Sequence, residues 1–184
     1  MLEPIFNAHV QQAVFRAALK AQSFPGRCVA LPESTAQTAS HRALLAALLD
    51  AEVSLADPQN LLSATADWPF LEARPTDAEH ADFILLSGEK VHSIKPRIGT
   101  LEEPEQSASL VLIVGHIGAN VGLELKLTGP GIQTEQRLQV EGLAREWLAL
   151  RQNWNTAFPM GVDIFLAGSN GLVALPRTTQ IEVI

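Results

Sequence analysis

Four polar residues near the carboxyl end of the sequence could do chemistry: Asp163, Arg177, Thr178 and Thr179. Asp163 opens one apolar run, and Arg177 follows a second apolar run that ends at Pro176. An arginine here can bind a phosphate or carboxylate group through two parallel hydrogen bonds, with the threonine hydroxyls as further donors. Alternatively, it can tie a strand end to a carboxylate such as Asp163 or to the last carbonyls of a helix. The first interpretation describes a ligand site; the second, which we prefer, describes a structural brace.

The other reactive residue types are scattered along the chain. No histidine has a second histidine four residues away, and a single cysteine, Cys28, allows no cysteine pair, so the sequence predicts no metal site. The histidines are His9, His41, His80, His92 and His116. Cys28 lies in the apolar run 27–31 and is expected to pack as a small hydrophobe, and no serine has the G-x-S-x-G pattern of a hydrolase nucleophile. We therefore predict no catalytic group.

A glycine-rich stretch, GHIGANVG at residues 115–122, raises the question of a nucleotide site. A phosphate-binding glycine loop opens a helix whose amino end faces the phosphate, but the following LELKL alternates like a strand. Its spacing also differs from G-x-G-x-x-G and G-x-x-x-x-G-K-[ST]. The stretch is therefore expected to be a turn or hairpin rather than a nucleotide site.

Composition limits the class of protein. A chain of 184 residues that is 47% hydrophobic can bury the core of one domain, here residues 1–184. The net charge of −7, without any run of lysine or arginine, disfavours nucleic acid and anionic membranes as partners. The amino-terminal sequence lacks the pattern of a secretory signal, and no apolar stretch is long enough to span a bilayer. These features predict a cytoplasmic protein.

The elements that must position the polar cluster can be read from hydrophobic periodicity. Apolar residues at helical spacing predict helices over residues 10–21 and 41–50, the latter capped by Thr38 or Ser40, and a last helix that contains Trp147 and Trp154 on one face. Short apolar or alternating runs predict strands at 27–31, 51–56, 81–87, 109–114, 121–127 and 132–140. The segment 95–106 is expected to be an exposed loop.

The clearest local signal is the stretch 162–175, VDIFLAGSNGLVAL, in which two apolar runs flank a short turn. Asn170 and Gly171 can supply the positive φ angles that a tight hairpin needs, so these two strands must be antiparallel. Helices between the earlier strands indicate parallel pairing. The sequence therefore predicts an α/β fold with a mixed, mostly parallel sheet and an antiparallel edge strand.

At several places the sequence resembles a known family. The stretch 158–183, FPMGVDIFLAGSNGLVALPRTTQIEV, is similar to the carboxyl-terminal signature of the H subunit of bacterial carbon–phosphorus lyase, the PhnH family. The stretches 15–26 (FRAALKAQSFPG), 81–86 (ADFILL) and 127–132 (LTGPGI) resemble the same family, so the resemblance extends over most of the chain.

The resemblance implies a role in phosphonate catabolism. Members of this family act with the G, I and L subunits to transfer the ribose triphosphate of ATP onto an alkylphosphonate with release of adenine, before the J subunit cleaves the carbon–phosphorus bond. It also implies a homodimer when the subunit is isolated, and a three-layer α/β/α sandwich similar to the fold of pyridoxal-phosphate-dependent transferases. Two roles remain open: an assembly subunit without chemistry of its own, which we prefer, or a nucleotide- or phosphonate-binding subunit that contributes Arg177.

The similarity to pyridoxal enzymes does not extend to the cofactor. Those enzymes need a lysine for the Schiff base and an acid at the pyridine nitrogen, and in transferases of this fold the acid precedes the lysine. No lysine follows Asp163, and the four lysines of the chain lie elsewhere: Lys20, Lys90, Lys95 and Lys126. We therefore expect no cofactor.

Overall fold

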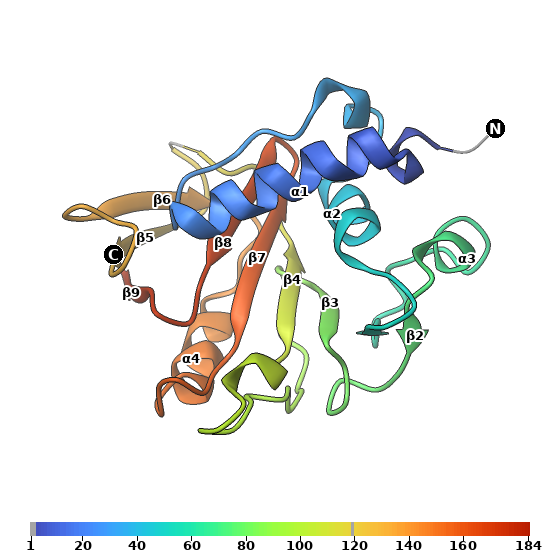
Figure 1. Cartoon of the computed structure of the whole chain (residues 1–184). Coiled ribbons are helices and arrows are strands. Elements are labelled where there is room, and N and C mark those ends of the chain that lie inside the picture. Colours follow the sequence, from blue (N-terminus) through green and yellow to red (C-terminus); the bar gives the residue numbers. More distant parts are fainter. Residues whose placement is uncertain (1–2, 119) are drawn as a thin grey trace.

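The computed structural model describes residues 3–118 and 120–184. Helices α1 and α2 precede the first strand, and strands dominate the second half of this range (Figure 1). The α-helices are α1 (Ala8–Ser23), α2 (Ser40–Leu48), α3 (Trp68–Leu71) and α4 (Arg145–Trp154), and the 3-10 turns are η1 (Pro4–Phe6), η2 (Glu33–Thr35) and η3 (Pro104–Gln106).

The main sheet has six strands in the order β2-β1-β3-β4-β7-β8. Their bounds are β1 (Ser54–Ala56), β2 (Arg74–Pro75), β3 (Phe83–Ser87), β4 (Ser109–Ile113), β7 (Asp163–Gly168) and β8 (Gly171–Leu175). All neighbours are parallel except β7 and β8, which form the antiparallel hairpin. The predicted mostly parallel sheet with an antiparallel edge strand is confirmed.

The hairpin turn differs in detail from the prediction. Gly171 has a positive φ of 150°, and a Cβ atom there would lie 2.4 Å from the carbonyl oxygen of Val29. Asn170 is not among the residues with positive φ; instead its side chain accepts from Ile117 N at 3.0 Å and donates to Ile117 O at 2.7 Å. The asparagine therefore fastens the turn to the loop after β4, and only the glycine supplies the unusual backbone angle.

A second, antiparallel sheet was not anticipated as a separate unit. It consists of β5 (Leu123–Thr128), β6 (Gln136–Val140) and β9 (Gln180–Val183) in the order β6-β5-β9. The alternation predicted for β5 is confirmed, because Leu125 and Leu127 are buried while Lys126 pairs with Glu182 of β9 on the other face. The short strand β9 escaped prediction because the sequence around it carries no turn signal that links it to β5.

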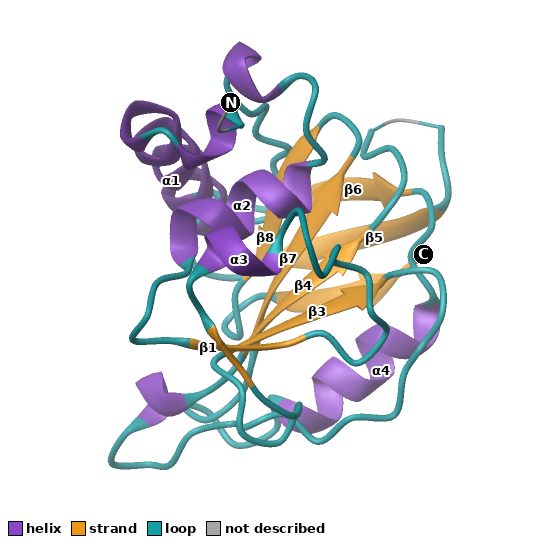
Figure 2. Cartoon of the chain, turned by 90° about the vertical axis from the view of Figure 1, so that its right-hand side faces the viewer, coloured by secondary structure: helices purple, strands orange, loops and turns teal. Residues whose placement is uncertain are grey.

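The layers of the fold are visible in Figures 1 and 2. Helices α1, α2 and α3 lie on one side of the main sheet, and α4 lies on the other side. The hydrophobic cluster on the α4 side also includes Leu125 and Leu138 of the small sheet. The predicted three-layer α/β/α sandwich is therefore correct on one face only, because a helix and a sheet share the other face.

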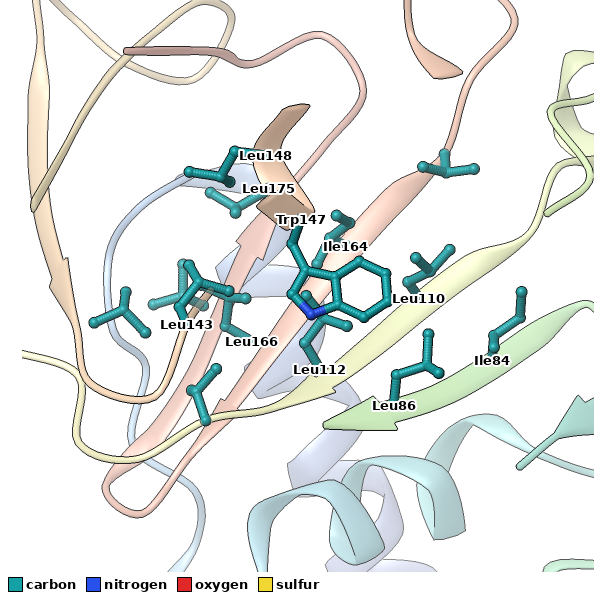
Figure 3. Close-up of a cluster of buried hydrophobic side chains, with 14 of the residues drawn as sticks. Ile84, Leu86, Leu110, Leu112, Leu143, Trp147, Leu148, Ile164, Leu166 and Leu175 are labelled. Atoms are coloured by element: carbon teal, nitrogen blue, oxygen red, sulfur yellow. The ribbon is translucent and has the colours of Figure 1, made fainter. Parts of the chain in front are cut away.

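Helix α4 is anchored by Trp147, which is fully buried against β3, β4 and β7 (Figure 3). Its indole Nε1 donates to Ser87 O at 3.2 Å, which satisfies the one polar group of the ring. Trp154, two turns later, packs partly buried against the same cluster. The core assignment of both tryptophans is confirmed.

Three local expectations were wrong. Cys28 is exposed, and the predicted strand 27–31 is reduced to a single bridge between Val29 and Leu172. Ser40 does not cap α2, because Ala39 occupies the cap position and the Ser40 hydroxyl donates to Gly168 O of β7 at 2.6 Å. The prediction of an exposed loop at 95–106 agrees with the structure, in which most of this segment is exposed and only the short turn η3 is regular, although side chains described below anchor it.

Candidate functional site

The Asp163–Arg177 pair lies at the amino edge of the parallel strands. Asp163 is the first residue of β7, and Arg177 follows β8, whose antiparallel direction brings its last residues back to the same edge. Nη2 of Arg177 donates to Asp163 Oδ2 at 2.7 Å, and the backbone N of Arg177 donates to Asp163 Oδ1 at 2.6 Å. Both side chains are mostly buried, with exposed fractions of 15% for Arg177 and 22% for Asp163.

Every N–H of the Arg177 guanidinium has an acceptor inside the protein. Nε donates to Asp163, Nη1 donates to the carbonyls of Pro104 at 2.9 Å and Pro159 at 3.1 Å, and Nη2 donates to Asp163 and to the Ser107 hydroxyl. A guanidinium has five N–H donors, so this one has none left. Arg177 joins the segment 95–106, the start of β7 and the end of β8.

The two threonines behave differently from Arg177. The backbone N of Thr179 donates to Pro176 O at 2.9 Å, which closes a turn, and the Thr179 hydroxyl is buried without a hydrogen-bond partner among the described residues. Thr178 is partly exposed and lines a cavity beside α4. The structure thus brings the four predicted residues together at one turn but directs them to different surroundings.

A further residue at this turn, Arg151 of α4, was missed by the sequence interpretation. It is only 5% exposed, and its Nη2 donates to Pro176 O at 2.6 Å and to Thr179 O at 2.9 Å. Its Nε is sealed from solvent and has no acceptor among the described residues. Burial lowers the pKa of Arg151 to about 10, an effect that the negative charge of Asp163 opposes. Arg151 lies four residues after the buried Trp147, and that helical spacing is the signal that could have revealed it.

The cavity beside these residues has a volume of about 750 Å³ and lies between α4, β9 and the turn that follows β8. Its charged lining residues are Arg145, Arg151 and Arg177, and no carboxylate is among its lining residues within the described part of the chain. Leu148, Ile181 and Val183 form apolar walls. The combination of arginines and apolar walls is suited to an anionic ligand or an anionic side chain.

The glycine-rich stretch 115–122 lies at the opposite, carboxyl edge of the parallel strands. Several of its backbone N–H groups are already bonded within the protein, among them Gly115 N to Glu141 O at 2.8 Å, His116 N to Glu141 Oε2 at 3.0 Å, and Gly118 N to Gln139 O at 3.0 Å. These groups cannot also cradle a phosphate. Between β4 and β5, the described residues of this stretch form bends, a turn and one bridge, which agrees with the predicted turn or hairpin.

Within residues 3–118 and 120–184, no group of three or more histidine, cysteine, aspartate or glutamate side chains comes together in a way that could hold a metal ion. No lysine lines the cavity, and Lys126 pairs with Glu182 on an exposed strand face. In the same residues, no helix is both long and apolar enough to cross a membrane.

Comparison with known proteins gives a consistent result. The family described as "Bacterial phosphonate metabolism protein (PhnH)" matches residues 5–182. A Stutzerimonas stutzeri protein named "Putative C-P lyase subunit protein HtxG" is 41% identical over 179 residues, which is 97% of this chain and 89% of that protein. A Rhizobium meliloti (strain 1021) protein named "Alpha-D-ribose 1-methylphosphonate 5-triphosphate synthase subunit PhnH" is 34% identical over 85 residues, 46% of this chain and 42% of that protein.

Proposed function

Because the chain belongs to the PhnH family of bacterial phosphonate metabolism proteins and is a subunit of the C-P lyase pathway, we propose that it is an assembly subunit without chemistry of its own. The reaction it supports joins the ribose triphosphate of ATP to an alkylphosphonate and releases adenine. The G, I and L subunits are its partners in that step, the J subunit acts next, and the complex works in the cytoplasm. Isolated, the chain forms a homodimer.

The saturation of Arg177 is the observation that carries this proposal. Its five N–H donors are all used by Asp163, Ser107, Pro104 and Pro159, so a bound nucleotide or phosphonate would have to replace an internal hydrogen bond. Arg177 therefore fits a brace better than a ligand clamp.

The outer face of α1 supports an assembly role. Phe15, Leu19 and Phe24 are large apolar side chains that remain exposed, and Leu19 is 51% exposed. Arg16 and Lys20 lie beside them on the same helix, which contains no acidic residue. A group of exposed apolar side chains that is rimmed by polar residues is typical of a surface that another protein covers. In a chain of net charge −7, this face fits a partner surface that is acidic and apolar.

Co-purification tests the assembly role. A tagged copy of this chain, expressed together with the other subunits, is expected to retain the G, I, J and L subunits in constant proportion. The double change Phe15→Ala and Leu19→Glu places a negative charge on the outer face of α1 and is expected to reduce their recovery by about tenfold or more. Arg137→Ala, an exposed change on the small sheet, is the matched control and should leave recovery unchanged.

Two results would contradict this proposal. A wild-type chain that is recovered without any other subunit would refute the assembly role itself. A double variant that retains its partners as well as Arg137→Ala does would leave assembly intact but remove α1 as the contact surface.

A further inference from the structure

Arg151 has hydrogen-bonding capacity that the described residues do not use. Nη2 donates both of its hydrogens, one to the carbonyl of Pro176 and one to that of Thr179. Nε–H and the Nη1 amino group have no acceptor among the described residues. Nε is completely sealed from solvent whereas Nη1 is not, and Arg151 is one of the residues that line the cavity, so Nη1 is the donor that a ligand in the cavity could reach. No carboxylate oxygen of the described residues lies within 4.0 Å of the guanidinium.

A buried charge without a counter-ion is costly, and proteins normally pair such a charge. Arg177 shows the usual solution close by, with Asp163 as its partner. Arg151 contacts the same turn but donates only to neutral carbonyls. Burial lowers the pKa of Arg151, and the negative charge of Asp163 opposes this effect by favouring the charged form, but Asp163 does not form an ion pair with it. The missing negative charge is therefore best supplied by a molecule that enters the cavity.

The lining of the cavity favours an anion over a neutral ligand. Arg145, on the same helix as Arg151, adds a second cation, and no acidic residue of the described chain lines the space although the protein as a whole carries a charge of −7. Thr178 and Gln152 provide neutral polar groups at the wall. The volume of about 750 Å³ falls within the range of small-molecule sites.

We propose that the cavity between α4 and β9 binds a small molecule through a phosphoryl or phosphonyl oxyanion, with Nη1 of Arg151 and the guanidinium of Arg145 as its charged donors. Guanidinium groups match the oxygens of phosphate and phosphonate groups in both charge and geometry. Because Arg151 of α4 also donates to two carbonyls of the turn Pro176–Thr179, a bound anion would strengthen the contact between that helix and the carboxyl-terminal strands. This goes beyond assembly, which requires no ligand.

Titration calorimetry and thermal unfolding of the isolated full-length chain test the site at low ionic strength, with inorganic phosphate, methylphosphonate and ATP as probes. At least one probe is expected to bind saturably and to raise the melting temperature. Comparable affinities for phosphate and methylphosphonate would identify a single oxyanion as the ligand group. ATP binding about tenfold or more tightly than phosphate would identify a triphosphate.

Variants assign the binding to the cavity. Arg151→Met is expected to reduce the affinity about tenfold or more, and Arg145→Ala several-fold, because each removes a charged donor. Arg137→Ala removes an exposed arginine outside the cavity and should leave the affinity unchanged. If Arg151→Met does not fold, Arg145→Ala decides alone, since Arg145 is exposed and makes no ion pair with the described residues.

Three results would overturn the proposal: no saturable binding of any probe up to about 10 mM, binding unchanged in a folded Arg151→Met chain, or binding reduced equally by Arg137→Ala. These outcomes are independent of the co-purification experiment. A chain that assembles but binds no oxyanion refutes only the site, and one that binds but does not assemble refutes only the assembly role.

Discussion

Arg177 belongs to the turn Pro176–Thr179 and Arg151 contacts the same turn from α4, yet the two arginines differ in the features that distinguish a brace from a binding group. Arg177 has a carboxylate partner, and all its donors are satisfied. Arg151 is more deeply buried, yet its Nε and Nη1 have no acceptor among the described residues. The difference teaches that burial of an arginine does not by itself indicate its role, whereas the balance between its donors and the available acceptors does.

The largest expected effect is at Arg177. Arg177→Ala leaves Asp163 without its charged partner and is expected to lower the free energy of unfolding by about 3 to 5 kcal/mol, because breaking a mostly buried pair strands the remaining charge. Denaturant unfolding at neutral pH measures this loss, with Arg137→Ala as the exposed control. A fully stable Arg177→Ala chain that assembles with its partners but does not support growth on a phosphonate would make Arg177 a functional ligand group instead.

Replacing Arg151 should mainly reduce the stability that the chain gains when a ligand binds. With a probe at about 100 times its dissociation constant, the wild-type chain is expected to gain about 2.7 kcal/mol of stability. Folded Arg151→Met should lose most of this gain.

Without ligand, Arg151→Met is expected to cost only about 1 kcal/mol, since the two hydrogen bonds it loses are offset by removal of a buried, unpaired charge. Denaturant unfolding with and without phosphate measures both quantities. If Arg151→Met alone costs as much as Arg177→Ala, the contrast between the two arginines does not hold.

The ion pair between Asp82 and Arg97 gives a smaller effect with a defined pH dependence. Asp82, just before β3, bonds to Ser54 and Arg97; burial raises its pKa, but hydrogen bonds from the Ser54 side chain and backbone and from Arg97 outweigh that effect and lower it. A lowered carboxyl pKa contributes stability above the unfolded value of about 3.9 that is lost as the pH falls through the folded value.

The stability difference between the wild type and Asp82→Asn should therefore shrink below about pH 4. Because Asp82 is about one third exposed, this contribution should stay below about 1 kcal/mol at neutral pH. Unfolding curves at a series of pH values measure it. A difference that is constant from neutral pH to pH 3 would show that the charge of Asp82 does not contribute.

The smallest effect is expected at the exposed pair Lys126–Glu182, which joins β5 and β9 on the solvent face. Lys126→Gln should leave the unfolding midpoint unchanged within experimental error, because water already solvates both groups. A clear loss of stability would mean that this pair is more than a surface contact. The size of the stability loss in these variants would then not follow how deeply each charged group is buried.

Much of the fold follows from local patterns. The hairpin β7–β8 and the alternation in β5 were predictable because a short turn and a period of two each depend only on residues that are close in the sequence. The small sheet was not, since β9 pairs with β5 more than fifty residues earlier, at a register that no local signal encodes. The shared outer layer of α4 and this sheet was missed for the same reason.

In the candidate site, too, some contacts could be predicted from the sequence and others could not. The proximity of Asp163 and Arg177 could be expected from the hairpin, which brings one end of each strand together. The acceptors from Pro104 and Ser107 could not, because they come from a loop seventy or more residues away. Arg151 could have been noticed from its spacing to Trp147, but its missing counter-ion depends on the tertiary surroundings and is visible only in the fold.

The edges of the two sheets bear on how this chain avoids aggregation. The edge strand β2 has only two residues and contains Pro75, which lacks a backbone donor. The outer edges of β8 and β6 are each met by a single bridge, from Val29 and Ile117. Strand β9 is short and exposes Glu182, and charge on an edge discourages pairing with another chain. Extension of a sheet from one molecule to the next is thus disfavoured at the strand edges of the described residues, which leaves the side-chain surfaces as the favoured places for contact with other proteins.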